Sequence, residues 1–245
     1  MIIKAIIPCR FKSVRLPGKP LKLIDGKPMF WHVYNQSLKS KLISEVIIAT
    51  DDTRIVRSCN SFGIKSIMTN RKHKTGSDRI AECVNKVKAD IYVNIQGDEP
   101  LINPSTIDKV INCLIRNFKN DQVVCSNAYI KIDSQKELIN PNIVKAIINR
   151  VNNNAVYFSR YPAPYNFKGI NSKYYKQIGL YAFKKEALKI FKTNKMGYLE
   201  KMESVELLRI LENDFKIKMV KVSKYSKSVD TIDDLKYIKK LIEKK

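Results

Sequence analysis

The stretch IIKAIIPCRFKSVRLPGKPL, residues 2–21, decides the fold class. Its first part is a nearly continuous apolar run up to Pro8, which is typical of a strand buried on both faces of a parallel sheet. Its second part, from Cys9 onward, is a loop rich in Arg, Pro and Gly. Ligands of open α/β sheets bind outside the carboxyl ends of the strands, so a basic loop at this place predicts a site for an anionic ligand.

Strand-like and helix-like patterns alternate through the first half of the chain. Short apolar runs predict strands at 45–49, 64–68 and 91–95. Longer amphipathic runs predict helices at 29–42, 51–62, 77–88 and 104–117. This order predicts an α/β fold with a doubly wound, mostly parallel sheet.

The pattern changes after residue 120, where strands are expected without full helices between them. These strands are expected at 123–130, 143–149, 155–159 and 177–183. A helix at 203–213, a strand at 216–222 and a closing helix at 231–242 follow. The sequence therefore predicts one compact unit over residues 1–245, with a mixed-sheet extension inside it.

Composition narrows the class of protein. Hydrophobic residues make up 44% of the 245 residues and charged residues 28%, as in an ordinary globular protein. No apolar run approaches the roughly 18 residues that span a bilayer, and the N-terminus does not resemble a signal peptide. Five scattered cysteines without CxxC spacing indicate reduced thiols, so we expect a cytoplasmic protein with no membrane partner.

The net charge of +23 is the one extreme value. Nucleic-acid binding is the usual use of such a positive field. Here the lysines are scattered, without a long basic block or a recognition motif, which favours an enzyme with polyanionic small substrates and no nucleic-acid partner.

The loop after the first strand carries Arg10, Arg15 and Lys19. Two guanidinium groups and an ammonium suit the triphosphate of a nucleotide. The loop has neither a Walker pattern nor a dinucleotide fingerprint. The alternative interpretation is a solvated basic loop.

The motif TGSDRIAE, residues 75–82, begins a helix whose free N–H groups suit a ligand. Ser77 has two interpretations, a helix cap complemented by Asp78 or a ligand-binding residue. Arg79 opposes the macrodipole in the first turn, which favours a functional role.

Two carboxylates are candidate metal ligands. In NIQGDEP, residues 94–100, a buried strand ends at Gln96, Gly97 and Asp98, so the carboxylate lies at the crevice where a hard cation and phosphates would bind. Asp230 lies in SVDTIDDL, residues 228–235, just before the expected cap Thr231. Taken alone, the residues favour a helix-start role for Asp230.

Taken together, these motifs resemble the 3-deoxy-manno-octulosonate (Kdo) cytidylyltransferase family nearly end to end. The further matches are GKPM, ATDD, PNIVKAI, YFSR, IGLYAF and ESVELLRILE. The resemblance implies a Rossmann-like sheet of the nucleotide-diphospho-sugar transferase type. It also implies a homodimer, with residues 120–190 supplying sugar contacts and dimer surface, and synthesis of CMP-Kdo for lipopolysaccharide or capsule.

The resemblance also implies roles for residues. Arg10, Arg15 and Lys19 would hold the CTP phosphates, with Arg15, Lys19 and Asp98 forming the catalytic group. Ser77 would approach the cytosine and Arg79 would support it, while Asp98 and Asp230 would bind Mg²⁺, which reverses the helix-start interpretation of Asp230. The residues implied to line the sugar-acid pocket are Gln96, Arg160, Gln177, Tyr181 and Glu203.

Gln177 departs from the family, in which His commonly precedes the Ile-Gly-x-Tyr segment. Gln177 and Tyr181 stand four positions apart in one expected strand, so we expect them to face the same side. The segment after Arg160 also diverges. An amino-substituted Kdo, a sialic-type acid and a phosphonate therefore remain alternative acceptors, and a nucleic-acid-binding or regulatory protein on the same fold is the rival of another class.

Overall fold

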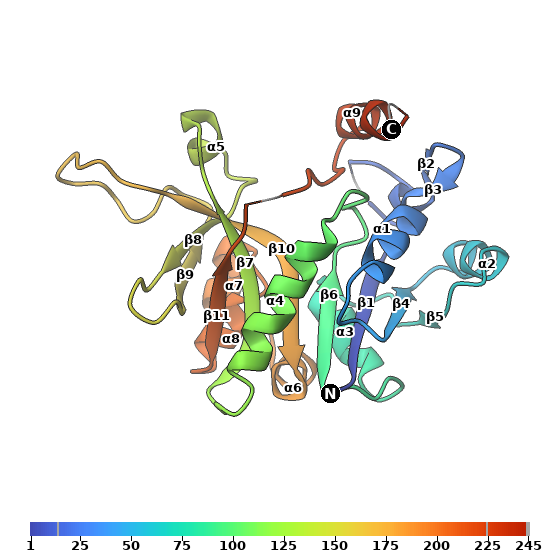
Figure 1. The fold of residues 1–245 in the computed structure, drawn as a ribbon, viewed down its shortest axis with the longest axis horizontal. Coiled ribbons are helices and arrows are strands. Elements are labelled where there is room, and N and C mark those ends of the chain that lie inside the picture. Colours follow the sequence, from blue (N-terminus) through green and yellow to red (C-terminus); the bar gives the residue numbers. More distant parts are fainter. Residues whose placement is uncertain (14, 224, 244–245) are drawn as a thin grey trace. The chain divides into compact units, whose positions relative to one another are not determined.

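The structure is a computed structural model that describes residues 1–13, 15–223 and 225–243. The chain forms two compact units, one built from residues 1–108 and 224–245 and the other from residues 109–223. Figure 1 shows the strands and helices that make up both units.

The first unit contains a parallel sheet in the order β6-β1-β4-β5. β1 and β6 are almost wholly buried, which explains their apolar sequences. The expected mostly parallel α/β architecture is confirmed. The strands of this sheet are β1 (Ile3–Cys9), β4 (Glu45–Thr50), β5 (Ser66–Met68) and β6 (Ile91–Ile95).

Helices follow these strands as the sequence predicts, with shorter bounds. They are α1 (Met29–Leu38), α2 (Thr53–Ser61), α3 (Gly76–Cys83) and α9 (Ile232–Ile242), while α4 (Pro104–Arg116) begins in this unit and ends in the second. The short elements η1 (Lys19–Leu21), β2 (Leu23–Ile24) and β3 (Lys27–Pro28) were not predicted. α9 packs on the segment after β1 through a cluster formed by Leu16, Ile24, Met29, Val229, Leu235 and Ile238. This cluster joins the end of the chain to its beginning.

The second unit contains the mixed sheet that the sequence predicts. β10 pairs antiparallel with β7, β11 pairs parallel with β7, and β8 pairs antiparallel with both β9 and β10. The bounds are β7 (Val123–Lys131), β8 (Lys145–Ile148), β9 (Ala155–Ser159), β10 (Tyr175–Lys184) and β11 (Lys216–Lys221). Its helices are α5 (Gln135–Ile139), α6 (Lys185–Thr193), α7 (Tyr198–Glu203) and α8 (Leu208–Glu212).

The predicted helix at 203–213 is confirmed only over residues 208–212. Ser204 adopts a left-handed conformation with φ of 51°, which ends α7 at Glu203, and α8 begins only at Leu208. α6 was missed, although its buried side chains include Leu188 and Phe191 at the spacing of one helix face.

The part of the chain that the structure describes contains no helix long and apolar enough to cross a membrane.

Candidate active site

The carboxyl ends of β1 and β6 are neighbours, because the two strands pair in parallel from Ile3 opposite Ile91. The loop after Cys9 and the residues after Ile95 therefore meet at one edge of the sheet. Gly97 makes this approach possible, since a Cβ there would lie 2.8 Å from Cys9 Sγ and 2.9 Å from the carbonyl oxygen of Pro8. A residue with a Cβ would not fit at position 97, which explains the glycine before Asp98.

A pocket of about 340 Å³ opens at this edge. It is mostly polar and brings together six of the residues singled out by sequence, from both ends of the first unit. The lining residues are Pro8, Arg10, Lys12, Ser13, Arg15, Lys19, Pro20, Gln96, Gly97, Asp98 and Asp230.

Lys19 joins the two predicted metal ligands. Its Nζ donates to Asp98 Oδ2 at 2.6 Å and to Asp230 Oδ1 at 3.2 Å. Burial lowers the pKa of Lys19, but the Asp98 and Asp230 carboxylates outweigh it, and the net shift is upward. Arg15 Nη2 also lies 3.0 Å from Asp230 Oδ1. With Arg10 and Lys12, four cationic side chains and two carboxylates therefore line one pocket.

The basic loop is closed on itself. Gly18, at φ of 68°, donates from its N–H to the carbonyl of Phe11 at 3.1 Å. The Arg54 guanidinium lies 3.3 Å from the centre of the Phe11 ring and is held by the Asp52 carboxylate. A side chain on α2 thus supports the loop that carries Arg10 and Arg15.

Asp230 does not cap α9. Thr231 is the N-cap and forms a capping box with Asp234, so the helix-start interpretation of Asp230 is wrong. The Asp230 N–H donates to Asp234 Oδ2 at 3.1 Å, while its own carboxylate accepts from Lys19 and Arg15. The side chain is thereby directed to the pocket.

Ser77 is not a cap either. Thr75 is the N-cap of α3, in a capping box with Asp78. Ser77 is fully buried, and its Oγ lies 3.4 Å from Asn94 Nδ2 on β6. The signal that sequence reasoning missed was the Thr-x-x-Asp spacing of residues 75–78.

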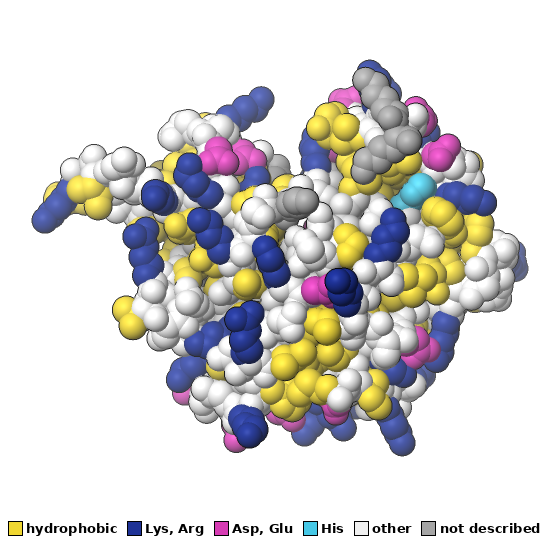
Figure 2. Space-filling view, viewed as in Figure 1, with side chains coloured by type: hydrophobic (Ala, Val, Ile, Leu, Met, Phe, Trp, Pro, Cys, Tyr) yellow, Lys and Arg dark blue, Asp and Glu magenta, His cyan; other side chains and the backbone are white. Residues whose placement is uncertain are grey.

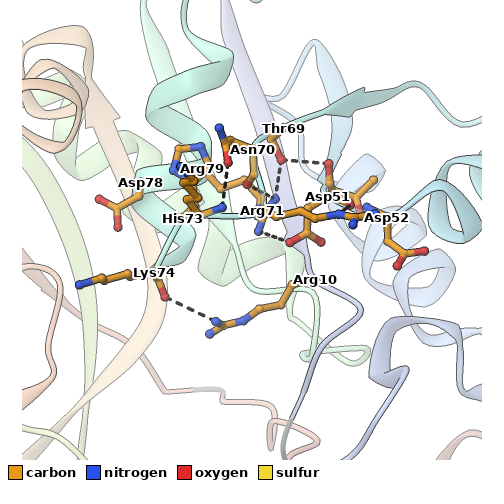
Figure 3. A network of polar contacts seen from close by, with 12 residues as sticks. Arg10, Asp51, Asp52, Thr69, Asn70, Arg71, His73, Lys74, Asp78 and Arg79 are labelled. Carbon is orange, nitrogen blue, oxygen red and sulfur yellow. Dashed lines mark hydrogen bonds and ion pairs between the residues drawn. The ribbon is translucent and has the colours of Figure 1, made fainter.

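The Arg79 side chain is buried and bonded to neighbouring side chains (Figure 3). It is 3% exposed, pairs with Asp51 Oδ2 at 3.0 Å and donates to Thr69 Oγ1. Arg10 reaches toward the same region, with Nη1 at 3.5 Å from the carbonyl of Lys74. A small second pocket lies here, lined by Pro8, Arg10, His73, Thr75, Gly76, Arg79 and Gln96.

Asp98 and Asp230 fit a magnesium ion. The ammonium of Lys19 already bridges both carboxylates, so their oxygens converge on one position that accepts a cation. Among the described residues no cluster of three or more His, Cys, Asp or Glu could hold a metal. Two carboxylates leave room for phosphate and water oxygens, which is the coordination that Mg²⁺ favours.

Glu99, beside Asp98, was not singled out by sequence. It is 3% exposed and accepts from Ser226 Oγ at 3.1 Å. Burial, and after it the nearby Asp98 carboxylate, raises the pKa of Glu99 to about 8.

In the second unit, Arg160 and Glu203 are joined by hydrogen bonds. The Glu203 carboxylate accepts from the Arg160 N–H at 2.7 Å and from Tyr157 Oη at 3.3 Å. The Arg160 guanidinium donates to the backbone carbonyls of Glu203, Pro141 and Ser204. These bonds use three of its five N–H groups.

Gln177 and Tyr181 lie on β10, on either side of a register shift against β7. Asn127 Nδ2 holds this irregular stretch by donating to the carbonyls of Ile178 and Leu180. Because the shift interrupts the alternation of the strand, spacing alone does not place the two side chains on one face. Gln177 Nε2 is buried and has no hydrogen-bond partner among the described residues.

Comparisons with solved structures define the class of protein. The structure of CMP:2-keto-3-deoxy-manno-octonic acid synthetase complexed with CTP superimposes with a TM-score of 0.93 at 35% identity, covering 100% of this chain and 99% of that one. The inositol-1-phosphate CTP transferase of T. maritima shares the fold, with a TM-score of 0.69 at 16% identity over 99% and 96% of the two chains. The α/β fold is that of the nucleotidyltransferases.

Sequence comparison is more specific. A family model described as Cytidylyltransferase matches residues 4–218. The 3-deoxy-manno-octulosonate cytidylyltransferase of Geotalea daltonii is 41% identical over 96% of this chain and 96% of that protein. The Escherichia coli protein of the same name is 36% identical over 97% of this chain and 94% of that protein. The chain belongs to the 3-deoxy-manno-octulosonate cytidylyltransferase family and is a nucleotidyltransferase.

Proposed function

We propose that the protein transfers the cytidylyl group of CTP to 3-deoxy-manno-octulosonate, forming CMP-Kdo and pyrophosphate. The observation that carries this proposal is the pocket in which Arg10, Arg15 and Lys19 meet Asp98 and Asp230. Two comparisons support the proposal. The similar synthetase was solved in complex with CTP, and the Geotalea daltonii relative is named for Kdo.

The reaction is attack by the anomeric hydroxyl of the sugar acid on the α-phosphorus of CTP, with pyrophosphate as the leaving group. The protein contributes alignment and charge neutralisation, because phosphoryl chemistry needs little covalent help. We assign Arg10, Arg15 and Lys19 to the triphosphate, where they offset the negative charge that builds up on the leaving pyrophosphate. Gln96, at the end of β6, lies in the same pocket and is assigned to the sugar.

Asp98 and Asp230 would hold Mg²⁺ beside the phosphates. The ion would supply Lewis-acid neutralisation of phosphate oxygens when bound. Arg15 and Lys19, which now neutralise the two carboxylates, would then be released to contact the phosphates.

Ser77 and the start of α3 are assigned to the cytosine. Ser77 itself is buried, so its contribution is to hold the first turn of α3 against Asn94. Arg79, bonded to Asp51 and Thr69, supports that turn from behind.

The residues of the second unit are assigned to the sugar acid. Arg160 and the buried Lys145 bring two positive charges beside the single carboxylate of Glu203, and Lys145 Nζ donates to the Arg160 carbonyl at 2.7 Å. This excess of positive charge suits the carboxylate of a sugar acid. Gln177 and Tyr181 are assigned to its hydroxyl groups.

The scattered basic charge would serve these anionic substrates. Figure 2 shows Lys and Arg side chains spread over the visible face, without one continuous block. Nucleic-acid binding would require such a block or a recognition motif.

A panel assay tests the proposed function. Pyrophosphate release is measured with CTP, ATP or GTP, and with Kdo, 8-amino-Kdo or a sialic acid. We expect CTP to exceed the purine nucleotides at least about tenfold in kcat/KM, about 1.4 kcal/mol, and Kdo to be the best acceptor. Equal turnover with the purine nucleotides would contradict the assignment.

Two variants separate a metal ligand from a helix cap. Asp230→Ala should lower kcat by about two orders of magnitude with the fold intact. Thr231→Ala, which removes the N-cap of α9, should instead lower stability by about 1 kcal/mol and leave kcat near that of the wild type. The opposite pattern would remove Asp230 from the metal site.

We also propose that the protein is a cytoplasmic homodimer in which residues 120–190 supply dimer surface. The loop between β9 and β10 exposes large apolar side chains, Tyr161, Tyr165, Phe167 and Ile170, and extends away from the strands (Figure 1). Sedimentation of the wild type and of Phe167→Ser tests this, with a shift toward monomer expected for the variant.

A further inference from the structure

Glu99 and Ser226 form a buried contact behind the pocket. Asp98 lines the pocket, whereas the next residue, Glu99, is buried and does not line it. Ser226 is 8% exposed and donates from Oγ to Glu99 Oε2. The contact joins the turn after β6 to the segment 225–230, which lies more than a hundred residues further along the chain.

A second bond ties the same two segments. The Val229 N–H donates to the carbonyl of Asp98 at 2.8 Å. Val229 is fully buried in the cluster that also holds Leu16 and Leu235. The segment is therefore attached at Ser226 and again at Val229, and the residue that follows is Asp230.

These two hydrogen bonds connect the segments that carry the Asp98 and Asp230 carboxylates. Asp98 belongs to the turn that Glu99 anchors, and Asp230 to the segment that Ser226 anchors. The Asp230 N–H is fixed by Asp234 on its other side. The distance between the two carboxylates thus depends on how firmly the segment is held against the turn.

We propose that Glu99 is a positioning residue that holds Asp230 opposite Asp98 by accepting the hydrogen bond of Ser226. The proposal rests on the proposed function, in which both carboxylates bind Mg²⁺. Residues that orient metal-binding carboxylates affect metal affinity strongly, typically by about 10–100-fold when removed. Glu99 does not line the pocket, so in this proposal it acts through the segment that Ser226 belongs to.

Three variants test the proposal. Glu99→Ala and Ser226→Ala each remove one side of the contact, while Glu99→Gln keeps an oxygen that accepts from Ser226. Asp233→Ala is the matched control, since it removes an exposed carboxylate from the start of α9 without touching Glu99. For each protein we measure the Mg²⁺ concentration that gives half-maximal pyrophosphate release, and Mn²⁺ binding by electron paramagnetic resonance.

We expect Glu99→Ala and Ser226→Ala to raise the half-maximal Mg²⁺ concentration at least about tenfold and to weaken Mn²⁺ binding in parallel. The double variant should be no worse than the more impaired single variant, because both changes break one contact. Glu99→Gln should recover most of the loss, and Asp233→Ala should match the wild type. Unchanged metal dependence in folded Glu99→Ala, or equal loss in Glu99→Gln, would overturn the proposal.

Amide hydrogen exchange gives a readout that needs no activity. The Val229 amide should exchange faster in Glu99→Ala than in Glu99→Gln, because the segment is held less firmly. If the protein proves inactive with CTP and Kdo, the exchange result still tests the contact itself. If the protein is active but exchange at Val229 is the same in both variants, only the positioning role fails.

Discussion

Lys19 Nζ lies 2.6 Å from Asp98 Oδ2, so a side chain of the protein neutralises the carboxylate that we propose as a metal ligand. The same ammonium contacts Asp230. Binding of nucleotide and metal would thus break the contacts of Lys19 with Asp98 and Asp230. Lys19 would then contact the phosphates, and the two carboxylates would contact the metal. A metal bound by Asp98 and Asp230 would occupy the position that the Lys19 ammonium holds here.

Lys19→Met should therefore have opposite effects on two quantities. Mn²⁺ should bind the nucleotide-free variant more tightly than the wild type, because no ammonium competes for Asp98. kcat should fall at least about a hundredfold, because the variant loses a cation that we propose neutralises the phosphates. Electron paramagnetic resonance measures Mn²⁺ binding, and pyrophosphate release measures kcat. Lys22→Met, at an exposed lysine, is the control. Weaker Mn²⁺ binding in Lys19→Met would argue against this exchange of contacts.

Gly97→Ala should be poorly tolerated. Its Cβ would lie 2.8 Å from Cys9 Sγ and 2.9 Å from the Pro8 carbonyl oxygen, so β1 and the turn after β6 would have to separate. We expect a loss of about 1–3 kcal/mol in the free energy of unfolding, together with a large loss of activity. Chemical denaturation measures the first. Adding Cys9→Ala should restore only part of the stability, because the clash with the backbone oxygen remains; full recovery would show that the sulfur alone was the obstacle.

Asp52→Asn should change how stability depends on acid. The Arg54 guanidinium lowers the pKa of Asp52 below its ordinary value of 3.8, so the folded state binds this proton less readily than the unfolded state. The stabilisation is therefore present above pH 3.8 and is lost as pH falls through the folded-state pKa. Asn keeps the cap of α2 but cannot titrate, so the wild type should be more stable by about 0.2–1 kcal/mol at neutral pH.

This difference should disappear in acid. Urea unfolding of the wild type and Asp52→Asn from neutral pH to about pH 2.5 measures it. Arg54→Gln should abolish the same pH-dependent part, and the double variant should lose nothing further. A difference that stays constant with pH would assign the effect to capping alone.

Gln177→His should alter the choice of acceptor. Gln177 Nε2 is buried without a partner among the described residues, so it is available to a polar group of the sugar acid. Exchanging one neutral hydrogen bond corresponds to about 0.5–1.5 kcal/mol, or roughly two- to tenfold in the kcat/KM ratio of Kdo to 8-amino-Kdo. The KM for CTP should stay constant, and Gln122→His, at an exposed glutamine, is the control. A change confined to CTP parameters would place Gln177 on the nucleotide side.

The sequence by itself determined the fold class and most of the residues that converge on the pocket after β1 and β6. Buried parallel strands are recognisable as continuous apolar runs, and loops at their carboxyl ends meet whatever the intervening chain does. Arg10, Arg15, Lys19 and Asp98 lie together as that rule predicts, since all four line one pocket.

Only the tertiary structure decided what depends on contacts between distant segments. Thr231 caps α9 while the Asp230 carboxylate accepts from Lys19, and Glu99 accepts from Ser226, which lies more than a hundred residues further along the chain. The helix break coincides with the left-handed Ser204, and the register shift in β10 coincides with the bonds from Asn127; neither residue disturbs the hydrophobic pattern. Periodicity reports which faces are buried, whereas hydrogen bonds between distant segments decide where single side chains point.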